Sequence, residues 1–383
     1  MYFINRMKIL KEVNMIDLRV SAQGRAHNIQ RAKEQKIIIP TISQMKDPRT
    51  IPDKILDQLK SVGLWDVNPL NLFRITWKNE PKESGGLFGA PNYIVLPSEL
   101  TGVKAKILLM VGGWGKNADG FSMMARDPAK RKAFCDNVLK ACMDYGIDGV
   151  DLDWEYPTYG AKSDGGAYVN GYHVDDTKNF TLLVKELRET LGKDRLISYA
   201  ASDSGKYMDH KAALEYVDYL NIMTYSMGDP PSKHNSPLYK SFQNSRGGAE
   251  SIDIYIGKGV PVDRMNYGMA YYGHGDGEIY PSSVQFHRIK NILEKGVWTD
   301  DKGKEHSVVG YNIRYWDKTG KVPYLGDASG KMYASYEDLE SIAEKIKFVK
   351  QKGLLGAFGW EYREDEASGT LRHAVYEGLR GKQ

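Results

Sequence analysis

Three carboxylic acids occupy alternate positions in one short stretch of this 383-residue chain: Asp151, Asp153 and Glu155. The positions between them are apolar, and they are filled by Val150, Leu152 and Trp154. Because successive side chains of a β-strand point to opposite faces, the pattern predicts a strand with its acids on one face, about 6.6 Å apart. Crowding and burial oppose ionisation, so at least one carboxyl is expected to keep its proton near neutral pH and act as a general acid.

An edge strand with an acidic face toward solvent is the structural alternative. Acidic residues are poor strand formers, and three in alternation are rare at a position that serves structure alone. We therefore favour a functional site in the mouth of a barrel.

The stretch Asp148-Gly-x-Asp151-x-Asp153-x-Glu155 resembles the signature of family 18 glycoside hydrolases, the chitinases and endo-β-N-acetylglucosaminidases. The likeness continues more loosely from about residue 106 to about residue 364. It implies an α/β fold, a (β/α)8 TIM barrel with a small α+β insertion. It also implies hydrolysis of β-1,4-linked N-acetylglucosamine polymers, with a carbohydrate substrate as the partner.

The strand geometry bears on the mechanism. A retaining glycosidase with two carboxylates needs its nucleophile about 5–5.5 Å from the acid, across the sugar. Asp153 follows the same strand face as Glu155, which favours a nucleophile supplied by the substrate. The resemblance implies that Glu155 is the general acid and base and that Asp153 orients the acetamido N–H. Asp151 then lies behind Asp153 and shares a proton with it.

Further site residues follow from the resemblance. Tyr225, in Met223-Thr-Tyr225, resembles the tyrosine that hydrogen-bonds the acetamido oxygen, and Trp360 resembles the tryptophan beneath the scissile sugar. A buried structural tyrosine and a core tryptophan are the alternatives. The family often has an acid after this tyrosine, whereas this chain has Ser226, which leaves substrate contacts and pH behaviour open. The remaining substrate-binding candidates are Trp114, Tyr156, Met223 and Tyr272.

Alternating strands and helices are expected to position these residues at the carboxyl ends of parallel strands. The expected strands cover residues 106–111, 150–155, 196–202, 217–226, 266–273 and 354–360. The expected helices cover residues 128–145, 177–191 and 336–352. The insertion is expected at about residues 274–333.

Residues 1–103 do not fit this pattern. The first two barrel strands are not recognisable there, although residues 36–40 suit a short strand and residues 52–61 a helix. Residues 29–103 resemble the leading segment of a tryptophan-synthase-like enzyme that depends on pyridoxal phosphate. That likeness stops before the cofactor lysine, so no such cofactor is expected. A gene fusion, an assembly artefact, a partly disordered segment or divergent barrel strands would each explain residues 1–103, and residues 104–383 form the expected catalytic barrel.

The composition limits the classes of protein and of binding partner that we expect. A hydrophobic fraction of 41% and a charged fraction of 27% are ordinary for a globular protein, and no apolar run reaches membrane-spanning length. The net charge of +4 is weak, and the basic excess lies in the first fifty residues. A solvated or disordered basic segment is favoured there over a nucleic-acid arm, so no nucleic-acid partner is expected. The lack of a long apolar run means that no membrane partner is expected. The histidines lack metal-ligand spacing, and no metal is expected.

We expect a monomer; the family resemblance suggests secretion, although no signal peptide is visible. A non-catalytic, lectin-like barrel and an endo-β-N-acetylglucosaminidase acting on N-glycan cores are the functional alternatives.

Overall fold

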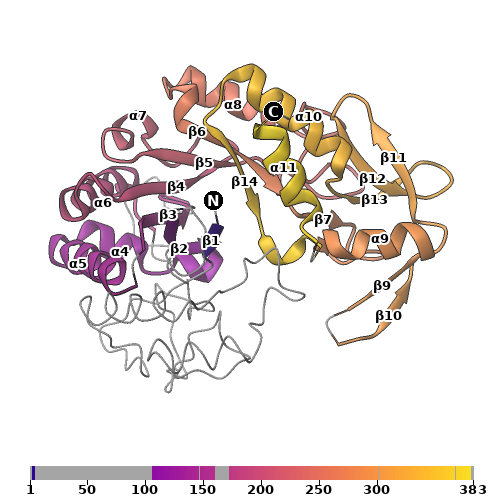
Figure 1. Cartoon of the computed structure of the whole chain (residues 1–383), viewed down its shortest axis with the longest axis horizontal. Coiled ribbons are helices and arrows are strands. Elements are labelled where there is room, and N and C mark those ends of the chain that lie inside the picture. The colour runs from indigo at the N-terminus through magenta and orange to yellow at the C-terminus, as the bar shows by residue number, and fades with distance from the viewer. Residues whose placement is uncertain are drawn as a thin grey trace, which may run out of the picture. The chain divides into compact units, whose positions relative to one another are not determined.

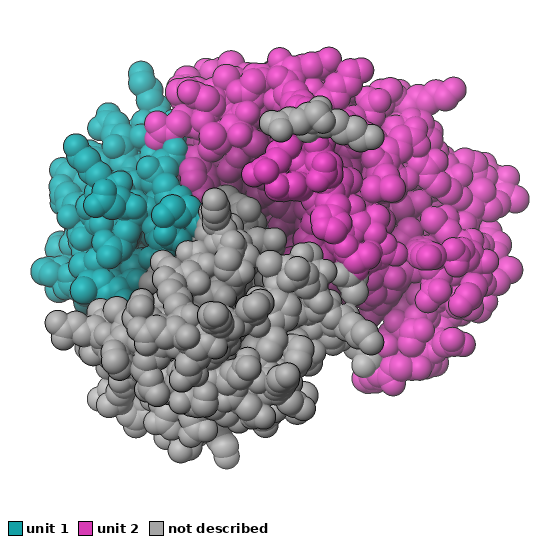
Figure 2. All heavy atoms as spheres, in the orientation of Figure 1, with its two compact units in different colours: residues 1–200, 207–218 teal, residues 201–206, 219–383 magenta. Residues whose placement is uncertain are grey.

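The computed structural model describes residues 2–4, 106–145, 147–159, 172–300, 302–366 and 368–380 (Figure 1). The chain divides into two compact units, one with residues 1–200 and 207–218 and the other with residues 201–206 and 219–383 (Figure 2). Almost all of the atypical segment 1–103 lies outside the described residues. The short strand expected at 36–40, the helix expected at 52–61 and the cofactor-enzyme likeness at 29–103 therefore fall outside them too.

Unit 1 is built on parallel strands in the order β1-β2-β3-β4, each hydrogen-bonded to the next. The strands are β1 (Tyr2–Ile4), β2 (Ile107–Trp114), β3 (Gly149–Glu155) and β4 (Leu196–Ser202). The residues from Leu196 onward pair with β3. The acidic stretch therefore forms a strand with parallel neighbours on both sides, and the edge-strand alternative is wrong.

Helices follow these strands in the chain. They are η3 (Gly115–Ala118), α4 (Phe121–Arg126), α5 (Pro128–Tyr145), α6 (Asp176–Leu191) and α7 (His210–Ala213). The apolar face of β3 is fully buried, and Trp154 stacks on Phe121 of α4 with ring centroids 5.2 Å apart. Phe180 of α6 lies 6.3 Å from the same Trp154 ring. Burial of these aromatic rings fixes which way β3 faces, and so directs the acids to the other side.

Unit 2 contains three further parallel strands in the order β5-β6-β14. They are β5 (Tyr219–Met223), β6 (Met265–Ala270) and β14 (Gly356–Trp360). An antiparallel sheet in the order β11-β12-β13-β7-β8 forms the insertion, together with a two-stranded β9–β10 ribbon. Its strands are β7 (Tyr272–Gly275), β8 (Val284–Gln285), β9 (Val297–Thr299), β10 (Glu305–Ser307), β11 (Ile313–Asp317), β12 (Val322–Gly326) and β13 (Met332–Ser335).

The helices of unit 2 are α8 (Gly248–Gly257), η4 (Val262–Arg264), α9 (Phe286–Lys295), α10 (Leu339–Lys352), η5 (Tyr362–Glu364) and α11 (Thr370–Arg380). Helix α10 begins later than the expected residue 336 because Asp338 caps it. The Asp338 carboxylate accepts hydrogen bonds from the backbone N–H groups of Glu340 and Ser341, both at 3.0 Å.

Two expected strands differ from the structure. The stretch 266–273 is not one strand, because β6 ends at Ala270 and Tyr272 begins β7 in the antiparallel sheet. In chain order, the strands of this antiparallel sheet run from Tyr272 of β7 to Ser335 of β13. The stretch 217–226 is also shorter than expected, ending at Met223, and Ser226 adopts a left-handed backbone with φ of 53°.

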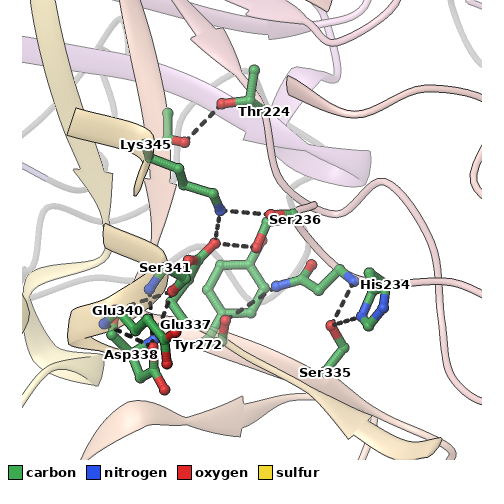
Figure 3. Close-up of polar contacts among 12 residues, drawn as sticks. Thr224, His234, Ser236, Tyr272, Ser335, Glu337, Asp338, Glu340, Ser341 and Lys345 are labelled. Carbon is green, nitrogen blue, oxygen red and sulfur yellow. Dashed lines mark hydrogen bonds and ion pairs between the residues drawn. The ribbon is translucent and has the colours of Figure 1, made fainter. Parts of the chain in front are cut away.

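A buried polar network anchors α10 to the loop after β5 (Figure 3). The Lys345 ammonium, which is fully buried, donates to the backbone carbonyl of Ser236 at 2.5 Å and forms an ion pair with Glu337. The Ser341 hydroxyl donates to the other Glu337 oxygen at 2.6 Å. Every charged group in this network has a partner, which is what buried charges require.

Candidate active site

The acidic face of β3 lies against two neighbouring strands. Asp151 and Asp153 are 2% and 5% exposed, and the Ser198 hydroxyl on β4 donates a hydrogen bond to Asp151. In the β2–β3 ladder the residue opposite Asp153 is Gly112, and the residue opposite Glu155 is Trp114. The three acids thus follow one face, as the sequence predicts, with the inner two buried.

Gly112 makes this close arrangement possible. Its φ of +112° lies in a region that side chains rarely adopt, and an added Cβ would lie 2.2 Å from the backbone oxygen of Asp153. The same Cβ would lie 2.9 Å from a ring carbon of Phe121. Glycine at position 112 therefore allows β2 to pack closely against β3 beside Asp153.

Glu155 ends the strand and is partly buried. Burial raises its pKa above the ordinary value, and side-chain hydrogen bonds with Tyr156 and Asp153 act in the opposite direction. A carboxyl with a raised pKa at a strand end is suited to general acid catalysis.

Aromatic residues surround the end of β3 within unit 1. Trp114 is 56% exposed, and its ring centroid lies 6.2 Å from that of Tyr156. The Tyr156 ring stacks on Tyr207 at 4.9 Å. The structure therefore brings Trp114 and Tyr156 beside Glu155, as expected. Sequence reasoning did not single out Tyr207 or Tyr159; the signal available for Tyr159 was the density of tyrosine and glycine after residue 156.

The candidates in unit 2 form a second group. The Tyr225 ring lies 6.1 Å from Tyr272 and 6.0 Å from Phe358 of β14, both edge-on. The Ser226 hydroxyl lies 2.6 Å from the Tyr272 hydroxyl, so the residue that replaces the usual acid is hydrogen-bonded to a neighbouring site candidate. Tyr272 reaches this position from β7 of the insertion and not from a parallel strand.

The side-chain amide of Asn235 fixes this second group. Its oxygen accepts from the backbone N–H of Ser226 at 2.9 Å, and its nitrogen donates to the backbone carbonyl of Tyr272 at 3.1 Å. Met223 is the buried last residue of β5, and Trp360 is the partly buried last residue of β14. Both therefore stand at carboxyl ends of parallel strands.

Within the described residues, no group of three or more His, Cys, Asp or Glu side chains is arranged to hold a metal ion. None of the helices in the part of the chain that the structure describes is long and apolar enough to cross a membrane.

Parallel strands joined by helices, with two buried carboxyls beside a carboxyl of raised pKa at a strand end, are typical of barrel proteins with a glycosidase-type site. Residues 98–365 match the model of glycosyl hydrolases family 18, and the chain belongs to this family. The expected fold class is thereby confirmed, and so is the family resemblance. The comparisons do not support the likeness of residues 29–103 to enzymes that use pyridoxal phosphate.

The chain is 33% identical over 308 residues to Chitinase A1 of Niallia circulans, covering 73% of this chain and 43% of that protein. It is 30% identical over 300 residues to Chitotriosidase-1 of Mus musculus, covering 70% of this chain and 60% of that protein. The chain thus spans less than two thirds of each of these relatives. A solved family 18 N-acetylglucosaminidase from Paenibacillus barengoltzii is 30% identical with a TM-score of 0.57, covering 72% of this chain and 82% of that one.

Proposed function

We propose that the protein hydrolyses β-1,4-linked N-acetylglucosamine polymers, chitin or chitooligosaccharides, with retention of configuration. The observation that carries the proposal is Glu155 at the end of β3, with a raised pKa and a hydrogen bond to the buried Asp153. The names of the relatives support this substrate class, since two of the chains compared above are a chitinase and a chitotriosidase.

In the proposed mechanism Glu155 donates its proton to the glycosidic oxygen as the bond to C1 breaks. The acetamido oxygen of the same sugar attacks C1 and forms a cyclic oxazolinium intermediate. Asp153 accepts a hydrogen bond from the acetamido N–H and stabilises the positive charge, and Asp151 shares a proton with Asp153. A water molecule then attacks C1 and gives its proton to Glu155, which restores the starting state.

The remaining roles in the proposed mechanism are assigned to residues of unit 2. Tyr225 donates a hydrogen bond to the acetamido oxygen and so directs it toward C1. Trp360 offers an aromatic face to the C–H bonds of the reacting sugar, while Met223 and Tyr272 contact the substrate beside it. Residues 104–383 contain all of these groups and form the proposed catalytic region. The comparisons do not favour a non-catalytic lectin-like barrel or an activity restricted to N-glycan cores.

The test uses a chromogenic chitooligosaccharide with wild type and Glu155→Gln. Loss of one general acid is expected to lower the turnover rate roughly 10²- to 10⁴-fold. Glu189→Gln is the matched control, because Glu189 is an exposed residue of α6 within 4.0 Å of Lys185. Equal activity in Glu155→Gln and wild type would overturn the assignment, whereas Glu189→Gln should keep full activity.

A further inference from the structure

Three consecutive residues in the segment after β5, His234, Asn235 and Ser236, are fully buried in unit 2 (Figure 3). The Nδ1 atom of His234 lies 2.9 Å from the hydroxyl of Ser335, the last residue of β13. The Ser236 hydroxyl donates a hydrogen bond to Glu337, just before α10. Asn235 therefore lies between two anchored neighbours, one bound to the insertion and the other to the start of α10.

Every polar group of Asn235 has a partner. Its backbone N–H donates to the Ser335 hydroxyl at 3.2 Å, and its backbone carbonyl accepts from the Met227 N–H at 2.8 Å. The side-chain oxygen accepts from the backbone N–H of Ser226 at 2.9 Å, and the side-chain nitrogen donates to the backbone carbonyl of Tyr272 at 3.1 Å. Turning the amide by 180° would place two donors together and two acceptors together, so these partners determine its orientation.

The oxygen end of the Asn235 amide holds the turn that carries Tyr225. Ser226, the next residue, has φ of +53°, in the left-handed region that non-glycine residues seldom occupy. On the other side of the turn, the Thr224 hydroxyl donates to the backbone carbonyl of Gly268 on β6 at 2.7 Å. The Tyr225 ring packs so closely on Gly268 that an added Cβ there would lie 2.8 Å from it. Tyr225 is thus held from β6 on one side and from Asn235 on the other.

The nitrogen end of the same amide holds the start of β7. Tyr272 is the first residue of that strand, and its backbone carbonyl is the group that accepts from Asn235. The Tyr272 ring lies edge-on to Tyr225, with ring centroids 6.1 Å apart. One buried amide therefore links a parallel-strand segment and an insertion strand, each of which carries a candidate site residue.

We propose that Asn235 is a positioning residue for hydrolysis, with its amide oxygen setting Tyr225 and its amide nitrogen setting Tyr272. This inference rests on the proposed function, in which Tyr225 directs the acetamido oxygen toward C1 and Tyr272 contacts the substrate beside it. An interaction that aligns the reacting atoms contributes to kcat, whereas one made equally in the ground state and the transition state contributes to KM. The two ends of one amide should therefore act on different kinetic constants.

The test measures kcat and KM for Asn235→Asp and Asn235→Ala with a chitooligosaccharide. Asn235→Asp keeps an oxygen for the Ser226 N–H but places a second oxygen against the Tyr272 carbonyl. It should raise KM roughly 3- to 10-fold, the size expected for one lost hydrogen bond, and leave kcat unchanged. Asn235→Ala loses both bonds and should also lower kcat roughly 10- to 100-fold, because the attacking group is no longer aligned.

Asn244 provides the matched control, since it is another buried side-chain amide in the same segment. Its oxygen accepts from the His234 N–H at 2.8 Å, and its nitrogen donates to the His234 carbonyl at 2.9 Å and to the Met227 carbonyl at 3.4 Å. Asn244→Asp should lower the melting temperature as Asn235→Asp does, but leave kcat and KM unchanged. Equal kinetic changes in these two variants would overturn the inference, because both amides would then act only through the fold. If Asn235→Ala does not fold, this comparison of the two aspartate variants decides.

A binding experiment separates failure of this inference from failure of the proposed function. Glu155→Gln, Glu155→Gln/Asn235→Asp and Glu155→Gln/Asn244→Asp are titrated with a six-sugar chitooligosaccharide by calorimetry, which needs no turnover. Weaker binding by the Asn235 variant alone supports its role even if the wild type cleaves nothing. Equal binding by all three proteins rejects that role even if cleavage is normal, and absence of binding in all three counts against both proposals.

Discussion

Trp114 and Glu155 lie directly opposite each other where the parallel strands β2 and β3 end. Because register partners in a parallel ladder point to the same face, an exposed aromatic ring stands beside a carboxyl whose pKa is raised by burial. The proposed function assigns to this one pair of neighbouring positions both binding of the sugar chain and protonation of the glycosidic bond. The spacing between them is fixed by backbone hydrogen bonds rather than by loops.

The pH dependence of activity should report the Glu155 carboxyl. Burial raises its pKa above the ordinary value of 4.5, and the proposed mechanism needs its protonated form. The alkaline limb of kcat/KM should therefore lie above pH 4.5, with activity falling as the pH rises through the folded-state pKa. A limb centred at the ordinary glutamate value would contradict this environment for Glu155.

The same shift has a consequence for stability. The folded state binds this proton more tightly than the unfolded state, so the stabilisation is complete below the ordinary pKa of 4.5 and is lost as the pH rises through the folded-state value. Glu155→Gln removes the titrating group. Thermal unfolding followed across this window should show a decline in Tm for wild type that is smaller in Glu155→Gln; identical slopes would rule out the linkage.

Gly112→Ala should be strongly destabilising. The new methyl group would lie 2.2 Å from the Asp153 backbone oxygen at a φ of +112°, so β2 and β3 must separate. Overpacking and backbone strain together should cost about 2–4 kcal/mol in the free energy of unfolding. Gly115→Ala is the matched control: its φ is +65° but nothing lies within 4 Å of the added atom, so only the smaller backbone cost is expected. Similar losses in both variants, measured by denaturant unfolding, would show that the contact with Asp153 is unimportant.

Ser226 and Tyr272 should behave as a coupled pair. Their hydroxyls lie 2.6 Å apart, and a hydrogen bond of this kind contributes about 0.5–1.5 kcal/mol to stability. Ser226→Ala and Tyr272→Phe should each lower the free energy of unfolding by such an amount. The double variant should lose no more than either single variant. Simple addition of the two losses would mean that the hydroxyls act independently.

Lys345 should be intolerant of replacement by an apolar residue. It is fully buried and paired with Glu337, and burial lowers its pKa. Lys345→Met leaves the Glu337 carboxylate without its cation and should cost about 3–5 kcal/mol in the free energy of unfolding. Lys345→Met/Glu337→Gln removes both charges and should recover part of this loss. If the double variant is less stable than the single one, charge burial is not the cause.

Much of unit 1 could be predicted because its signals are local. The alternation from Val150 to Glu155 specified a strand with two different faces, and helix α5 has the expected bounds, Pro128–Tyr145. Strand β1 escaped prediction because it is three residues long and pairs with β2 from about one hundred residues away in the chain. No periodicity can reveal a pairing of that kind.

The candidate site residues also fall into two groups, those that local sequence patterns predict and those that depend on contacts between distant segments. Glu155, Asp153 and Trp114 follow from sequence pattern and resemblance, since each stands at or near the end of a strand that the pattern predicts. The central position of Tyr159 depends on ring contacts with residues from three separate segments, which no spacing encodes. Tyr272 was identified as a candidate, but its strand was wrong, because an apolar run does not show where the chain passes from a parallel to an antiparallel sheet.

The insertion begins and ends on neighbouring strands. His274 of β7 pairs with Ser335 of β13, and Gly275 pairs with Ala334, so the chain enters and leaves this module at adjacent points. Because its two ends lie on adjacent strands, this segment can be shortened to a hairpin or exchanged for a segment of another size. The distance between its two ends stays the same in either case. Exchange of this module therefore changes the segment that carries Tyr272, a proposed substrate contact, and leaves the residues of the acidic strand β3 unaltered.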